Sequence, residues 1–418
     1  MGQVITPGRG LDFGPYMTDS IVKVDFDKLR NYRLSRTTAQ LQKDGLGAVL
    51  LFEPHNVRYT TGFNVPPYGR LEPRWWALVP REGKPKLWGI GEMEEIFADQ
   101  MPWVEIRTTP TAIDFLVAET WYAGWEKEIV SALTEWGVEN EPLGMDGVPG
   151  TDPFAIQTLF EKHRVKLVSA HRTMLEARKI KSEEEISLMG IAASIAEACH
   201  AEALAHIKPG IKENELCGII HNKALSLGAE WIEANVCSFG ENTNPNRFSW
   251  TDRMLRPGDM GYIDMVGIQF CGYRTCVYRD FTVGKASQAQ KNLYKKAVSF
   301  YMAGLDKIKA GNTAADIINA YPQPEFWVHE SPPQPYLFSG YAHGLGVCQY
   351  DLPRIDNVSA RSATPPVLEE NMVMAIETWT GKKGARNAVR LEDMVVVRKD
   401  GYELLSRWPI DELIEVPL

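Results

Sequence analysis

The stretch GDMGYIDMVGIQFCGYRTCVYRDFTVG, residues 258–284, decides the fold. Its composition predicts two apolar strands joined by a turn. Asp264 lies in the first strand and Cys276 in the second. A carboxylate in a buried strand is strongly unfavourable unless it is paired or holds a metal ion. Asp264 is therefore interpreted as a site residue.

Three later fragments repeat this pattern of one polar group in an apolar strand or tight turn. The polar groups are His343, Glu377 and Glu392. Their shared pattern predicts that they form a single site with Asp264 and Cys276. The fragments are GYAHGLGVCQYD (340–351), NMVMAIETW (371–379) and VRLEDMVVV (389–397).

Composition excludes several classes of protein. A chain of 418 residues favours two domains, and a net charge of −9 with a pI near 5.5 argues against a nucleic-acid or anionic-membrane binder. The six cysteines form no CxxC pair, which argues against a disulfide framework or zinc knuckle. No apolar run is expected to be long enough to span a bilayer, and no signal-peptide core is visible. We expect a cytoplasmic protein.

The N-terminal half has the pattern of a small α/β domain. Residues 1–23 are rich in Gly and Pro and are expected to be flexible. Helical periodicity over 25–43 precedes a buried strand at 45–52. The segment 53–69 is predicted as a polar turn followed by a half-buried strand, and 75–90 as a hairpin.

The C-terminal half is predicted to begin with helices. Ser182 and Glu185 form the S-x-x-E pattern of a capping box, so a helix is expected to start there. We predict an N-terminal domain over 24–170 and a catalytic domain over 171–418.

The four fragments, in this order, resemble the pita-bread family of creatinase, prolidase, aminopeptidase P and methionine aminopeptidase. The segment NYRLSRTTAQLQKDGLGAVLLFEPHNVRYTTGF (31–63) extends the resemblance to the two-domain creatinase type. Together with GAEWIEANVCSFGENTNP (228–245), it also looks like the dimethylsulfoniopropionate lyase branch. The resemblance implies an α/β N-terminal domain and a pita-bread domain, whose pseudo-symmetric curved antiparallel sheet is flanked by helices.

The resemblance also implies a metal site made of two Asp, one His and two Glu. The matching positions are Asp264, Cys276, His343, Glu377 and Glu392, so a cysteine replaces the second Asp. We expect either no metal or one divalent ion, which would be Fe, Zn or Mn.

Other positions depart from the family. Gln349 stands where the lyase branch has its proposed base, and Val266 where that branch has an additional Asp. Tyr350 and Arg247 stand where other members have His. Gln349 and Tyr350 are expected to line the substrate site. Arg247 would bind a substrate carboxylate, unless it is an exposed turn residue.

Each site residue has an alternative interpretation. The two Glu could instead form a salt bridge with Arg390 or Arg279. Cys276 is a metal ligand, a nucleophile or a small core residue. His343 is an acid/base catalyst or a satisfied polar residue.

Aromatic residues of the N-terminal domain could form a wall for a small cation or pack in a core. These are Tyr59, Phe63, Tyr68, Trp75 and Trp76. The resemblance implies a homodimer in which the N-terminal domain covers the partner's site, where Phe63, Tyr68 and Arg70 would line the pocket.

The expected function is hydrolysis of a C–N bond in a compact zwitterionic or carboxylate substrate. His343 would act as acid/base, and Glu377 and Glu392 would position the substrate or a single metal. Elimination, as in the lyase branch, is a second hypothesis, which the replacement of a base by Gln349 disfavours. A metal-dependent Xaa-Pro peptidase is a third hypothesis, and a non-catalytic binding protein is a fourth.

Overall fold

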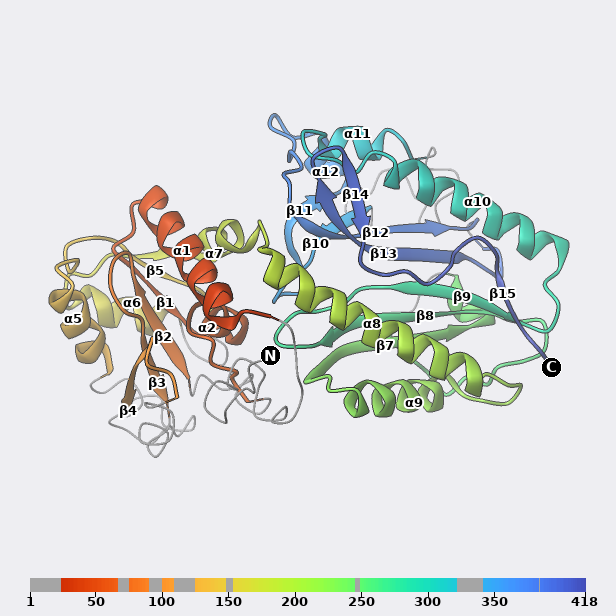
Figure 1. The fold of residues 1–418 in the computed structure, drawn as a ribbon, viewed down its shortest axis with the longest axis horizontal. Coiled ribbons are helices and arrows are strands. Elements are labelled where there is room, and N and C mark those ends of the chain that lie inside the picture. Colours follow the sequence, from red (N-terminus) through yellow and green to blue (C-terminus); the bar gives the residue numbers. More distant parts are fainter. Residues whose placement is uncertain are drawn as a thin grey trace, which may run out of the picture. The chain divides into compact units, whose positions relative to one another are not determined.

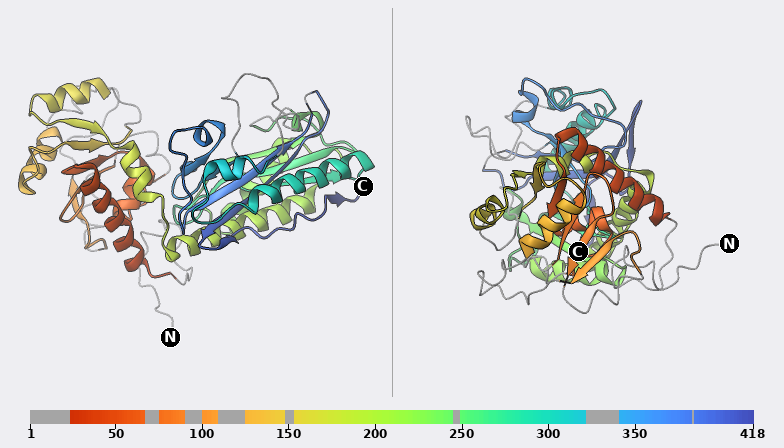
Figure 2. Two further views of the ribbon diagram at one scale, coloured as in Figure 1. Left: turned by 90° about the horizontal axis from the view of Figure 1, so that it is seen from above. Right: turned by 90° about the vertical axis from the view of Figure 1, so that its left-hand side faces the viewer.

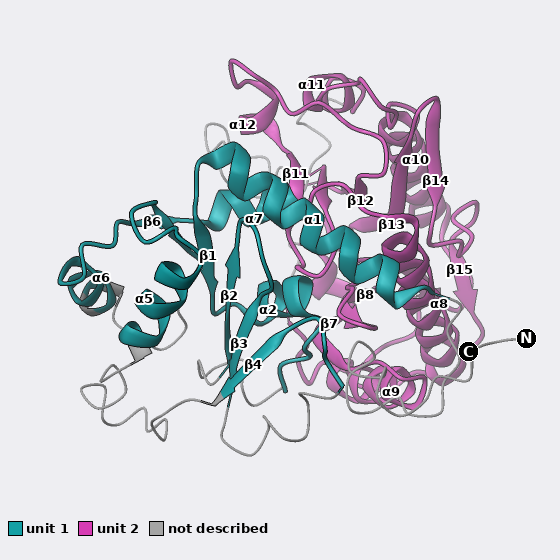
Figure 3. Cartoon of the chain, turned by 60° about the vertical axis from the view of Figure 1, so that its left-hand side comes forward, with its two compact units in different colours: residues 1–178 teal, residues 179–418 magenta. Residues whose placement is uncertain are grey.

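A computed structural model describes most of the chain in two compact units, residues 1–178 and 179–418 (Figure 3). The boundary follows helix α7 (His171–Arg178), whereas the sequence placed it before that helix. The predicted flexible segment 1–23 lies outside the described residues. The described residues are 24–66, 75–89, 100–108, 125–147, 153–244, 249–321, 341–382 and 384–418.

The first unit is a mixed sheet with helices beside it. Its strand order is β4-β3-β2-β1-β5-β6. β1 pairs antiparallel with β2 and parallel with β5, and helix α1 packs against α2 and α7. The elements are α1 (Phe26–Asp44), β1 (Ala48–Leu51), α2 (Pro54–Thr61), β2 (Trp76–Pro80), β3 (Lys86–Gly89), β4 (Glu105–Thr108), α5 (Trp125–Glu135), β5 (Leu143–Met145), α6 (Pro153–Glu161), β6 (Leu167–Ser169) and α7.

Helix α2 corrects the prediction of a turn and a strand after residue 53. Pro54 occupies its first turn, where the missing N–H has no partner to lose. Gly62 ends the helix in a left-handed conformation with φ of 81°. The β-branched and aromatic residues between Pro54 and Gly62 favour a strand. The segment is nevertheless helical, because Pro54 and Gly62 favour the start and the end of a helix at these positions.

The N-terminal aromatic residues within the described part form core contacts. Trp76 stacks on Trp88 with ring centroids 6.5 Å apart, and Trp75 lies 6.3 Å from Phe63. Tyr59 is buried and donates a hydrogen bond to Ala177 O at 3.3 Å. Their packing supports the core interpretation.

The second unit is built on a predominantly antiparallel curved sheet of nine described strands (Figure 1). The main strand order is β11-β10-β12-β13-β9-β8-β7, with β14 beside β13 and β15 beside β9. The elements are α8 (Glu183–His206), α9 (Glu213–Ser226), β7 (Trp231–Phe239), η3 (Gly240–Thr243), β8 (Met260–Gln269), β9 (Tyr278–Val283), α10 (Gln288–Leu305), α11 (Ala314–Ile318), β10 (Ala342–Gly344), β11 (Asp351–Ile355), α12 (Asn357–Ala360), β12 (Val373–Thr380), β13 (Val389–Arg398), β14 (Gly401–Leu404) and β15 (Ile414–Val416).

Helix α8 begins at the predicted capping box. The Ser182 side chain accepts from Glu185 N, and the Glu185 carboxylate accepts from Ser182 N. By length and composition α8 is long and apolar enough to span a membrane, whereas no apolar stretch of that length was expected from the sequence. It packs against α9 and β8, and half of its most apolar stretch is buried.

The helices cover one face of this sheet, and the predicted site lies on the other. Helix α10 packs on β12 and β13, while α8 and α9 lie along β7 and β8 (Figures 1 and 2). Ile376 and Leu391 share a hydrophobic core with Tyr301 of α10. Successive strand residues alternate between faces, so Glu377 and Glu392 point away from α10.

Candidate functional site

Four polar side chains form a row across the middle of the sheet. Glu377 of β12 pairs with Glu392 of β13, Glu392 with Tyr278 of β9, and Tyr278 with Asp264 of β8. Residues directly opposite each other in a sheet share a face. Strand register alone therefore brings together three of the predicted carboxylates.

His343 and Cys276 complete the cluster. One ligand atom each from Cys276, His343 and Glu392 lies within 4.8 Å of the others. His343 Nε2 is 3.7 Å from Glu392 Oε1, and all three side chains are buried. The convergence that was predicted for these residues is present in the structure.

The orientation of His343 is fixed by its neighbour. Nδ1 lies 3.1 Å from Gly344 O, and a carbonyl can only accept, so Nδ1 carries the proton and Nε2 offers its lone pair. Burial lowers the pKa of His343, with the Glu377 charge acting in the opposite direction, so the ring is neutral near pH 7. A Cβ on Gly344 would clash with Leu352 O, so only glycine fits there.

Two buried carboxylates have oxygens without a hydrogen-bond partner, although the Arg390 guanidinium lies nearby. Both oxygens of Glu392, and Oδ1 of Asp264, accept no hydrogen bond from the part of the chain that is described. Burial raises the pKa of Glu392 well above its usual range, and the Glu377 charge adds to this. Burial also raises the pKa of Asp264, partly offset by Arg390. Unpaired buried oxygens beside an imidazole and a thiol are a donor set that fits a divalent ion.

Glu377 has partners that Glu392 lacks. Its Oε2 accepts from Trp379 Nε1 at 2.9 Å and lies 3.7 Å from an Arg390 nitrogen. The salt-bridge interpretation thus holds for Arg390 and Glu377. Arg279 pairs with Asp393 instead, at 2.5 Å.

Arg390 is enclosed by aromatic rings. Its guanidinium carbon lies 3.9 Å from the ring centre of Trp379, 4.0 Å from that of Tyr278 and 5.1 Å from that of Tyr262. The contacts are cation–π interactions in a desolvated setting. These three aromatic residues were not predicted from the sequence, although each lies two residues from a predicted ligand, which is the repeat of one strand face.

Cys276 is a thiol and not a pre-activated nucleophile. It is buried, and burial together with the charges of Glu392 and Asp264 raises its pKa well above the usual value. A reactive cysteine needs a lowered pKa. The cluster therefore favours the interpretation of Cys276 as a metal ligand.

Gln349 and Tyr350 lie on the loop that follows His343. Gln349 is buried and donates to Thr275 O at 3.3 Å, which anchors the loop. Tyr350 is 58% exposed, and its ring centre is 4.8 Å from that of His343. Tyr350 therefore covers the imidazole on its solvent side.

Four further residues were predicted to line the substrate site. Phe63 is buried within the first unit. Tyr68, Arg70 and Arg247 lie outside the described residues.

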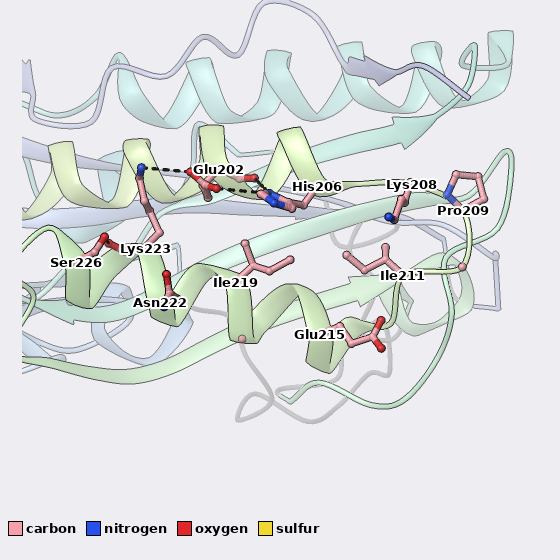
Figure 4. A pocket seen from close by; sticks show the side chains of 12 residues that line it. Glu202, His206, Lys208, Pro209, Ile211, Glu215, Ile219, Asn222, Lys223 and Ser226 are labelled. Atoms are coloured by element: carbon pink, nitrogen blue, oxygen red, sulfur yellow. Dashed lines mark hydrogen bonds and ion pairs between the residues drawn. The ribbon is translucent and has the colours of Figure 1, made fainter.

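An open groove of about 950 Å³ lies between α8 and α9, and none of the predicted site residues lines it (Figure 4). Glu202 there lies 3.2 Å from Lys223 Nζ and 3.6 Å from His206 Nδ1. Glu202 thus has a cationic partner in Lys223.

Comparison with known proteins identifies the family. The profile of metallopeptidase family M24 matches residues 187–399, and the profile of the creatinase/prolidase N-terminal domain matches residues 33–180. The chain belongs to metallopeptidase family M24. This M24 protein has the creatinase-type arrangement of an N-terminal α/β domain and a pita-bread domain, as the sequence predicted.

Relatives of the M24 protein are distant but span nearly its whole length. Dimethylsulfoniopropionate lyase DddP of Roseovarius nubinhibens is 23% identical over 416 residues, which cover 96% of this chain and 91% of that protein. An Xaa-Pro dipeptidase from Bacillus anthracis has a TM-score of 0.73 at 20% identity, covering 92% of this chain and 99% of its own. A dipeptidase from Pyrococcus horikoshii OT3 has a TM-score of 0.74 at 21% identity, with the same coverage.

Proposed function

We propose that this M24 protein hydrolyses a C–N bond in a compact substrate that is zwitterionic or carries a carboxylate. The observation that carries the proposal is the buried convergence of Cys276, His343 and Glu392 within 4.8 Å. A binding protein would gain stability from a neutral packed core at this place, so unpaired buried carboxylates support a chemical role.

His343 is the indispensable residue. Its Nε2 lone pair faces Glu392 and can do one of two things. It can accept a proton from the water that attacks the carbon of the scissile bond, and return that proton to the leaving nitrogen. Alternatively, it can bind a divalent ion together with Cys276 and Glu392. Such an ion, when bound, lowers the pKa of a water molecule or polarises a carbonyl group.

The test is turnover with a defined substrate panel. Xaa-Pro dipeptides, creatine and dimethylsulfoniopropionate are incubated with the protein, with and without added Mn²⁺, Co²⁺ or Zn²⁺. Amine release is measured for the first two substrates, and dimethyl sulfide and acrylate for the third, which contains no nitrogen. His343→Ala is expected to lower the rate by about 100- to 10,000-fold while the unfolding transition is kept. Hydrolysis that survives this change would overturn the proposal.

Elimination is the second candidate, because the DddP relative covers nearly the whole chain. Removal of a proton from carbon requires a base, and Gln349, where the lyase branch has its proposed base, is an amide bound to Thr275 O. We therefore favour hydrolysis. The products distinguish the two reactions: elimination creates a carbon–carbon double bond, and hydrolysis does not.

We also propose a cytoplasmic homodimer. None of the six cysteines, all of which lie in the described part of the chain, forms a disulfide bond, which suits a reducing compartment. Light scattering at several protein concentrations tests the dimer. If Phe63, Tyr68 and Arg70 contribute to a partner's site, changes at these positions will lower turnover without altering His343.

A further inference from the structure

We infer that Lys181 is a positioning residue, which acts through Asp351 to hold the ring of Tyr350 against His343. Lys181 lies one residue before the capping box of α8, and Asp351 directly follows Tyr350 in the chain. The inference rests on the proposed function only in its consequence for turnover, because the position of the Tyr350 ring can be measured without a substrate.

The ammonium group of Lys181 is buried beside a buried carboxylate. Its Nζ lies 3.9 Å from Asp351 Oδ2, and the two side chains are 1% and 0% exposed. Nζ also donates a hydrogen bond to Lys179 O at 3.3 Å. The ion pair joins the start of α8 to β11, whose first residue is Asp351 (Figure 1). Lys181 therefore holds the end of the loop that carries Tyr350.

Stability alone does not account for this ion pair. Removing an ammonium and a carboxylate from water is costly, and their attraction offsets that cost only when the geometry is close. At 3.9 Å, Lys181 Nζ and Asp351 Oδ2 are farther apart than in a charge-assisted hydrogen bond of about 2.8 Å. A neutral pair of similar volume would be about as stable. The charged pair therefore points to a role in fixing one conformation of the loop.

The loop before Asp351 is packed directly on the pair. A Cβ at Gly346 would lie 2.6 Å from Asp351 Oδ2 and 3.2 Å from Lys181 Cε, so only glycine fits there. Gly346 O also accepts a hydrogen bond at 3.0 Å from the main-chain nitrogen of Arg274, a residue between β8 and β9. The loop is therefore in contact with both the pair and the β8–β9 connection, and a displaced Asp351 would shift it.

Tyr350 transmits the position of Asp351 to the site. Tyr350 is 58% exposed, and its ring centre lies 4.8 Å from that of His343. An exposed side chain has few buried contacts, so its place depends on the main chain that carries it. Asp351 is the next residue of that main chain, and it pairs with Gly344, the residue after His343. Lys181 therefore holds the phenol ring over the imidazole.

The experiment removes both charges at once. Lys181→Met alone would leave the Asp351 carboxylate buried without the ammonium, which strongly destabilises a protein. The double variant Lys181→Met with Asp351→Asn removes both charges and nearly keeps the volume. We expect it to unfold at nearly the same urea concentration as the wild type. Modification of His343 by diethyl pyrocarbonate, at a pH where the imidazole is neutral, is expected to be several-fold faster than in the wild type.

A second comparison tests whether Lys181 acts through Tyr350. In the Tyr350→Ala background His343 is already uncovered, so the double change is expected to raise the modification rate by less than about twofold. A merely structural role would have the same effect in both backgrounds. Lys179→Met with Glu369→Gln is the matched control, because it removes an ion pair of 2.7 Å whose side chains are 21% and 52% exposed. This control should keep the wild-type rate.

Turnover is the third measurement. With a substrate that the panel identifies, the double variant is expected to turn over about 10- to 100-fold more slowly, because a small displacement beside the reacting groups has an effect of this size. The control pair at Lys179 and Glu369 should leave turnover unchanged.

Three results would overturn the inference. The first is a stable double variant in which His343 is modified at the wild-type rate. The second is an equal increase in the presence and absence of Tyr350. If the double variant does not fold, Gly346→Ala, whose Cβ crowds Asp351, decides the question, and a wild-type rate in that variant is the third. The modification rates need no substrate, so they remain valid if the proposed hydrolysis fails. Hydrolysis that depends on His343, together with unchanged modification rates, would refute this inference alone.

Discussion

Glu377 and Glu392 are direct cross-strand partners on one face of the sheet, so two carboxylates lie side by side in a buried setting. Like charges in this position destabilise a sheet. The arrangement lowers the stability of the metal-free protein in return for a cluster that can hold a cation, and this relationship leads to the first prediction.

Glu392→Gln is expected to stabilise the metal-free protein. It removes a buried carboxylate that has no hydrogen-bond partner in the described part of the chain. The pKa of Glu392 is raised in the folded state. The folded protein therefore loses stability relative to the unfolded chain as the pH rises above the ordinary pKa of a glutamate. Urea unfolding near pH 8 should show that the variant is more stable than the wild type by about 1–3 kcal/mol. Added Zn²⁺ is expected to reverse this difference, because it binds and stabilises the wild type. Glu403→Gln, at an exposed ion pair with Arg398, is the control, and a destabilised Glu392 variant would contradict the prediction.

Arg390→Met is expected to be strongly destabilising. The change leaves Glu377 and Asp264 without their buried cation and removes three cation–π contacts. Breaking a buried pair on one side costs about 3–5 kcal/mol. The same change at Arg354, whose side chain is exposed, should cost less than about 1 kcal/mol in the same urea series. Equal losses at the two positions would show that Arg390 has no special role.

Gly304→Ala, in α10, is expected to disturb the site from the helix-covered face of the sheet. A Cβ at Gly304 would clash with the ring of Tyr321, whose hydroxyl donates to Glu377 O at 3.0 Å. We expect a loss of about 1–3 kcal/mol and weaker Zn²⁺ binding. Gly218→Ala, in an exposed helix position with open space, should instead add about 0.5–1 kcal/mol. Opposite signs in thermal unfolding are the expected result, and a neutral Gly304 variant would contradict it.

Acid should destabilise the protein through His200. Burial, followed by the Arg279 charge, lowers the pKa of this imidazole to about 3. The unfolded chain takes up the proton near pH 6.5, so stability that is present above about pH 6.5 is lost as the pH falls toward 3, by about 1.4 kcal/mol per pH unit. The free energy of unfolding, measured with urea between about pH 7.5 and pH 5, should therefore change less steeply with pH for His200→Gln than for the wild type. His206→Gln, which changes an exposed residue, should keep the wild-type slope.

Tyr350→Ala should expose His343 without unfolding the protein. The Tyr350 ring is largely exposed and lies against the imidazole. Modification by diethyl pyrocarbonate, followed at the peptide that contains His343, is expected to become several-fold faster. Reaction at exposed His206 provides the internal control. Unchanged protection of His343 would mean that another part of the chain covers it.

The fold could be predicted in outline because its signals are local and periodic. The capping box at Ser182 and the hairpin of β2 and β3 lie where the sequence placed them. Helix α2 was missed because Pro54 and Gly62, its end signals, were outweighed by β-forming residues between them.

The candidate site could be predicted only in part. A polar residue in an apolar strand identified Asp264, Glu377 and Glu392, and strand pairing does align them. The partners of Arg390 could not be found in this way, because aromatic residues in strands look like core until the register is known. Tyr350 was predicted to line the substrate site, but its ring contact with His343 depends on the turn between them and could not be predicted.

The order of pairing in the central strands has a consequence for how the protein matures. Asp264 and Tyr278 lie on the consecutive strands β8 and β9, whereas Glu392 lies on β13, which comes much later in the chain. Pairing of this kind is slow, because loop closure precedes the gain from contacts. Glu392 can join Asp264 only after β13 has been synthesised and has paired with β9, so the complete cluster forms late in folding.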